Sequence, residues 1–311
     1  MKKIKKLALS AILTATLSLL IYLSPESREE FARSIRFCID ALIPSVFPFA
    51  VLGSLAGSEL AAVPEFITSV VGKLFGTDKR YSKALLFGLV FGFPTGASAM
   101  RTLPLESEKN IRDYRVTAAI SCVPGMAFTV LGVGRGLLGS SLLGAVIYLS
   151  NMLASLAVGC TLSALEKKKY ADNVQASSSQ NEASEGVVLT LCDSVTKAGG
   201  AMITVCAFVV FFSQISLLLS LLPLPKKVSF LLSLLLEVGG ATKKACEIPG
   251  NWRVLLSCFA ISWSGLSVQM QTISMSRERT LGLNYVALVR LCVSVTATLV
   301  CSAFFVIFDL A

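Results

Sequence analysis

The 311-residue sequence contains no histidine. Histidine is the usual general base at neutral pH and the commonest transition-metal ligand, so most hydrolytic and metal-dependent mechanisms lose their principal residue. Cysteine does not replace it, because the nine cysteines are scattered singly, mostly inside apolar runs, without a Cys-x-x-Cys pair. This pattern is typical of small buried apolar side chains. We therefore expect no enzyme activity, no metal site and no cofactor.

Charged residues are also scarce. They make up 15% of the chain, against about 25% in soluble domains, whereas 54% of the residues are apolar and the mean hydropathy is +0.73. Apolar runs near the ~20 residues that cross a bilayer recur along the whole chain. The sequence therefore predicts an all-α membrane protein of several spans. The net charge is +9, and the lysines and arginines lie at the ends of these apolar runs. This distribution argues against a nucleic-acid partner and favours a lipid bilayer.

Basic residues between the apolar runs predict the orientation of the first half, because they favour the cytoplasmic side. Four lysines within residues 2–6 precede an apolar run over 7–23, with no convincing signal cleavage site after it. Residues 1–36 are expected to form the first transmembrane helix and an external loop. Residues 37–169 are expected to form a first membrane repeat, beginning with a span over 37–63 that breaks near Pro44 and Pro48.

An interrupted apolar segment follows, "ALLFGLVFGFPTGASAM", with Gly92, Pro94 and Gly96 in its middle and basic residues on both sides. A crossing helix would put the second basic flank outside. A re-entrant hairpin with its tip at 93–96 keeps both flanks inside, and we favour the hairpin. Two further spans, over 116–133 and 137–165, then bring the chain back to the cytoplasm.

The second half repeats this order of elements. Residues 170–200 are expected to be a cytoplasmic linker, polar and serine-rich over 170–186, followed by an interfacial helix over 187–200. Residues 201–311 then give a long span, a broken run containing "EVGGAT", a span with a central glycine and a last span over 283–308. The first repeat begins outside and the second inside, so the two are predicted to be inverted. An outward-opening second hairpin would carry lysines on the disfavoured side, so a fully spanning second segment stays open.

Matching interruptions in two inverted halves indicate the binding site of a transporter, since half-helix ends present unpaired N–H or C=O groups to a solute. Glu237 is the sharpest residue, because a carboxylate inside a membrane needs a partner or a wet cavity. The alternatives are that glycine and proline only kink packed helices, that Glu237 reaches interfacial water, and that the amides bond to neighbouring helices. The expected solute-binding residues are Gly92, Pro94, Thr95, Gly96, Glu237, Gly239, Gly240, Thr242, Gly265, Gln269 and Gln271.

Several short stretches resemble the sporulation integral membrane proteins of the YlbJ type, which carry nucleoside-recognition (Gate) domains. They occur in the family's order over about residues 41–271: "LIPSVFPFAVLGSLAG", "GLVFGFPTGASA", "SCVPGMAFTVLGVGRGLLGS", "FVVFFSQI", "LLLEVGGAT" and "ISWSGLSVQMQ". Position by position, the residues that match the family's pattern are Gly92, Gly96, Glu237, Gly240, Gly265 and Gln271. Gln269 departs from it, standing where a histidine is expected, and the chain is shorter than typical members.

The resemblance implies a fold related to concentrative nucleoside carriers and a role in spore formation. It further implies that the solute is dipicolinic acid, moved across the outer forespore membrane. Bare N–H groups at the hairpins would suit the dipicolinate dianion, and Lys243, Lys244 or Arg290 could add attraction. A carrier for nucleosides or another small metabolite is the alternative. A membrane component of spore assembly that transports nothing is another.

Overall fold

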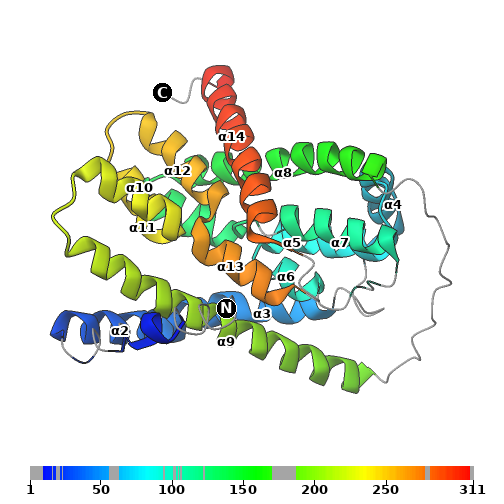
Figure 1. Cartoon of the computed structure of the whole chain (residues 1–311). Coiled ribbons are helices and arrows are strands. Elements are labelled where there is room, and N and C mark those ends of the chain that lie inside the picture. The colour runs from blue at the N-terminus through cyan, green and yellow to red at the C-terminus, as the bar shows by residue number, and fades with distance from the viewer. Residues whose placement is uncertain are drawn as a thin grey trace.

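The computed structural model of the chain is built of helices alone among the residues that it describes, and this confirms the predicted all-α class (Figure 1). The described residues are 10–15, 17–18, 22, 24–55, 63–93, 95–100, 103, 105, 107–121, 123–169, 187–276 and 281–308. The elements of the first half are α2 (Pro25–Phe37), the π-helix η1 (Cys38–Leu42), α3 (Ile43–Leu55), α4 (Glu65–Phe75), α5 (Lys79–Phe91), α6 (Thr95–Met100), α7 (Glu108–Ser121), the π-helix η2 (Ala127–Arg135) and α8 (Ser141–Lys169). Those that follow are α9 (Val187–Ser220), α10 (Lys226–Leu236), α11 (Val238–Cys246), α12 (Trp252–Trp263), α13 (Gly265–Met275) and α14 (Leu283–Phe308).

Within the described residues, four helical stretches are long and apolar enough to cross a membrane: Ser141–Glu166, Val188–Ser220, Trp252–Met275 and Leu283–Phe308. Each exceeds the ~20 residues that the hydrocarbon core requires. By length and composition the chain is therefore a membrane-embedded protein. Most of the predicted first span, over 7–23, lies outside the described residues.

The N-terminal part of the chain differs from the expected loop. Residues of the predicted external loop form α2, which begins where Ser24 Oγ accepts a hydrogen bond from Ser27 N. Pro25 occupies the first helical turn, where no backbone donor is needed, and Glu26 favours the positive helix end. These helix-start signals were present in the sequence. The predicted break near Pro48 is also absent, because α3 continues through this residue.

The boundary predicted at residue 200 falls inside a helix. α9 runs without interruption from Val187 to Ser220, so residues 187–200 continue the following span rather than forming a separate interfacial helix. An ion pair between Lys197 Nζ and Asp193 Oδ2, 2.6 Å apart and one turn from each other, makes these two charges compatible with a helix. The predicted linker over 170–186 lies outside the described residues.

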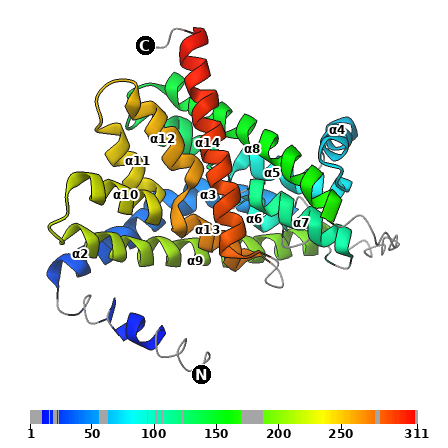
Figure 2. The same cartoon turned by 45° about the horizontal axis from the view of Figure 1, so that its top comes forward.

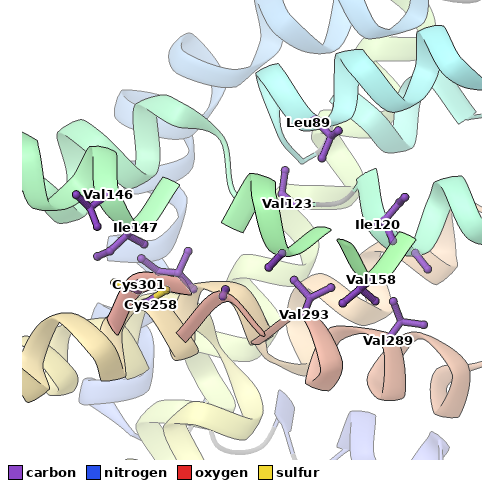
Figure 3. Close-up of a cluster of buried hydrophobic side chains, with 14 of the residues drawn as sticks. Leu89, Ile120, Val123, Val146, Ile147, Val158, Cys258, Val289, Val293 and Cys301 are labelled. Carbon is purple, nitrogen blue, oxygen red and sulfur yellow. The ribbon is translucent and has the colours of Figure 1, made fainter. Parts of the chain in front are cut away.

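In two places, a helix from the first half of the chain packs antiparallel against a helix from the second half. α9 lies along α2–α3: Gln214 Nε2 donates to Ser27 O at 3.3 Å, and Cys206, an earlier residue of α9, lies close to the later Cys38. α8 lies along α14 in the same way. Figure 3 shows Ile147 beside Cys301, whereas the later Val158 lies beside Val289. The main buried core therefore joins the two halves.

Oxidation tests the first of these pairs. In the membrane-embedded protein, a membrane-permeant oxidant is expected to form a disulfide between Cys38 and Cys206, because their thiols lie near each other. Peptide mapping by mass spectrometry detects the bond, and Cys38→Ser should remove it. Cys192 and Cys292 are both exposed and serve as controls for random cross-linking. Cys38 joined mainly to any cysteine other than Cys206 would contradict the packing of α9 on η1.

Candidate functional site

The first predicted interruption is the tip of a helical hairpin. α5 ends at Gly92, whose φ of 79° is a conformation that glycine adopts readily. α6 then folds back on α5, since a Cβ added to Gly88 would lie 3.1 Å from the Cα of Gly96. The amide of Phe93 at the tip donates to Val123 O at 2.7 Å. Pro94 lies outside the described residues.

This tip rests on a break in another helix, between α7 and η2. A Cβ added to Gly92 would lie 2.3 Å from the N of Gly125 and 2.4 Å from its Cα, so the two backbones touch. The predicted continuous span over 116–133 is therefore wrong. The signal that could have revealed the break is the dipeptide Pro124-Gly125, which favours a helix end.

The second predicted interruption is also a hairpin tip. α10 ends at Glu237, whose backbone is extended, and α11 begins directly after it. The two arms run antiparallel, because Lys244 on α11 reaches back to Ser229 on α10. The structure thus has a helix–break–helix hairpin at each of the two predicted places.

Glu237 fills the helix end that the sequence predicted to be bare. Its Oε1 accepts from Gly239 N and its Oε2 from Gly240 N, both at 3.2 Å, so the carboxylate caps α11. A negative charge is favourable at this positive end of a helix. The expectation of bare N–H groups for an anionic solute is therefore wrong for these two amides.

The second tip also rests on a broken helix, at the junction of α12 and α13. Ser264 and Gly265 both have a φ of 66° there. A Cβ added to Gly265 would lie 2.8 Å from the N of Glu237 and 2.9 Å from its Cα. Arg290 of α14, only 2% exposed, donates from Nη2 to Ser264 Oγ at 2.7 Å. Arg290 therefore holds this break rather than reaching toward solvent.

Two buried amides follow this break on α13. Gln269 Nε2 donates to Trp263 O at 3.1 Å, and Gln271 Nε2 donates to Ser267 Oγ at 3.2 Å. The side-chain carbonyl oxygen of each amide has no hydrogen-bond partner within the described part of the chain. Thr95 Oγ1, buried at the start of α6, is in the same situation. Thr242 is not, because its hydroxyl donates to Val238 O in its own helix at 2.7 Å.

α13 connects the two hairpins. It contacts α6 of the first hairpin and both arms of the second, and it lies between them in both views (Figures 1 and 2). The predicted residues therefore form two groups, one at the tip around Gly92 and one at the tip around Glu237. Gln269 and Gln271 lie on the helix that joins these groups.

A cavity of about 790 Å³ lies between α2–α3 and α9, and none of the described residues that line it belongs to either tip. Its walls are almost wholly apolar, and Gln214 is the polar exception. Walls of this kind favour an apolar occupant such as a hydrocarbon chain, and they offer few hydrogen bonds to a polar solute. We therefore place the candidate site for a polar solute at the hairpin tips and not in this cavity.

Comparison with models of protein families, with curated proteins and with solved structures gives no match for this chain.

Proposed function

We propose that the chain is a multi-pass membrane carrier for a small polar solute, which binds where α13 joins the two hairpin tips. The observation that carries this proposal is the backbone contact between each tip and a second broken helix, Gly92 on Gly125 and Glu237 on Gly265. Broken helices bring backbone polar groups to membrane depth, where they are tolerated when buried in protein or lining a wet cavity.

We further propose that the halves are inverted repeats and that the hairpins re-enter from opposite sides of the membrane. Each half has a hairpin, then a broken helix, then a long helix, in this order. The antiparallel pairs α3 with α9 and α8 with α14 support this relation. A twofold axis in the membrane plane turns each helix end for end, so a helix near that axis packs antiparallel on its own counterpart.

The resemblance to the YlbJ type makes dipicolinate the first candidate solute, with the outer forespore membrane as the site of transport. A sporulating strain that lacks the gene is then expected to make spores with a severely reduced dipicolinate content. Normal dipicolinate content in those spores would overturn this assignment. Spore dipicolinate, measured by terbium fluorescence, is the readout.

The Glu237 cap favours a second candidate, a neutral nucleoside-like solute. Its carboxylate already satisfies the amides of Gly239 and Gly240, so a dianion at this helix end would meet a charge of its own sign. A neutral solute could donate hydroxyl or amino hydrogens to the same carboxylate. The unpartnered amide oxygens of Gln269 and Gln271 would accept further donors.

Glu237→Gln separates the two solutes by the sign of its effect. In proteoliposomes, loss of the negative charge is expected to raise the apparent affinity for dipicolinate. For a nucleoside it is expected to lower the affinity about tenfold, because a hydrogen bond to a charged group contributes about 1.5 kcal/mol. Uptake of each labelled solute in competition with the other gives the measurement. Glu247→Gln, at an exposed position just after α11, is the matched control and should change neither affinity.

The same variants test the alternative of a spore-assembly component that transports nothing. Gly96 packs against the backbone of Gly88 and Ser121, with an added Cβ 2.8 Å from Gly88 Cα, so Gly96→Val should distort the first hairpin. A carrier would then lose uptake. If wild-type protein takes up neither solute, and if Gly96→Val and Glu237→Gln both support normal spores, the carrier proposal fails.

A further inference from the structure

Lys244 on α11 lies half-buried against α10, with its ammonium surrounded by oxygen atoms. Its Nζ lies 2.6 Å from Ser233 Oγ, 2.8 Å from Ser229 Oγ and 3.1 Å from Ser229 O. A lysine ammonium has three hydrogens to donate, so these three acceptors use all of them. None of the ion pairs found among the described residues involves Lys244.

The Ser233 hydroxyl is arranged as an acceptor toward this ammonium. Ser233 Oγ donates its own hydrogen to Ser229 O at 2.9 Å, which leaves its lone pairs directed at Lys244. The charge is therefore stabilised by neutral oxygen dipoles and not by a carboxylate. Proteins bind small monovalent cations with neutral oxygen atoms of this kind, which replace the hydration shell of the ion.

A small empty niche lies next to the ammonium. Its volume is about 10 Å³, close to the volume that one water molecule needs. Two more serines, Ser216 and Ser220 of α9, line it, and the rest of its wall is leucine. Three elements, α9, α10 and α11, thus contribute to one polar niche in apolar surroundings.

We propose that the three oxygen atoms of Ser229 and Ser233 form a site for a small monovalent cation and that the Lys244 ammonium is a tethered ion that fills it. The tethered charge joins the two arms of the second hairpin next to α9. The wild-type hairpin therefore needs no free cation at this position. The inference concerns the folded state and stands independently of which solute the chain carries, or whether it carries one.

Removal of the tethered ion should make the protein dependent on a free one. Lys244→Ala in detergent or nanodiscs is expected to melt about 5 °C below the wild type in choline chloride. Ammonium, sodium or potassium at the same ionic strength should restore most of this loss, with a saturable concentration dependence. The wild-type melting temperature should not depend on which of these cations is present. Lys243→Ala, at the exposed neighbouring lysine, is the matched control and should show no cation dependence.

The oxygen ligands provide the second test. In the double variant Lys244→Ala with Ser233→Ala, the small cations should no longer restore the melting temperature. A Lys244→Ala protein that is equally stable in all four salts would overturn the proposal and leave Lys244 as a hydrogen-bonding side chain only. Should Lys244→Ala not fold in any salt, Lys244→Gln keeps polar reach without charge, and a wild-type melting temperature for that variant in choline would also overturn it.

Discussion

Gly265→Ala is expected to be among the most damaging single substitutions in the chain. The new methyl would lie 2.8 Å from the N of Glu237 and 2.9 Å from both its Cα and the carbonyl C of Leu236. All three are backbone atoms, which cannot rotate away. The φ of 66° adds strain for any residue with a Cβ. Overpacking and strain together are expected to lower the free energy of unfolding by about 3–5 kcal/mol.

Gly250→Ala is the matched control for this experiment. Gly250 has a similar φ of 73°, but nothing lies within 4 Å of an added Cβ. It should therefore lose only about 1 kcal/mol, the part due to backbone strain. Thermal melting of the purified proteins is expected to place Gly265→Ala about 10 °C below the wild type and well below Gly250→Ala. Equal melting temperatures for the two variants would mean that the second tip does not rest on this break.

Gly92→Ala is expected to have an effect at least as large in the first half. The added methyl would lie 2.3 Å from the N of Gly125 and 2.4 Å from its Cα, closer than any contact predicted for Gly265. The φ of 79° at Gly92 is again unfavourable for alanine. Because the tip cannot stay on Gly125, uptake of the solute should fall to background even in the fraction of protein that folds.

Gly139→Ala controls for backbone strain in the same half. Its φ is 75°, and no atom lies within 4 Å of the position of its Cβ. Melting temperature and uptake are measured side by side for both variants. Gly139→Ala should melt within a few degrees of the wild type and keep its uptake. If Gly92→Ala behaves like Gly139→Ala, the contact between Gly92 and Gly125 is absent from the folded protein.

The sequence predicted both hairpin breaks because their causes are local. Gly92 ends α5 through its own φ, and the stretch after Glu237 contains two glycines whose amides the Glu237 side chain can reach. The last span was predicted with the bounds that the structure gives, since a long apolar run without charges at its centre has few other outcomes in a membrane.

Predictions of helix boundaries were wrong where two local sequence features favoured different structures. Pro48 was expected to break a helix, but a membrane helix tolerates proline when its neighbours supply other polar partners. Residues 187–200 were assigned to the interface because of Asp193 and Lys197. The ion pair between these side chains removes that objection to a single long α9.

The helical class, the membrane-embedded character and the positions of the hairpin breaks could therefore be predicted from the sequence. The length of an apolar run and the conformational freedom of glycine affect only the local structure, so both effects can be recognised in the amino-acid sequence. The sequence did not predict that Gly92 packs on Gly125, that Glu237 packs on Gly265 or that Arg290 bonds to Ser264. These contacts join residues that are more than two dozen positions apart, and which of many possible partners meet depends on how all the helices pack at once.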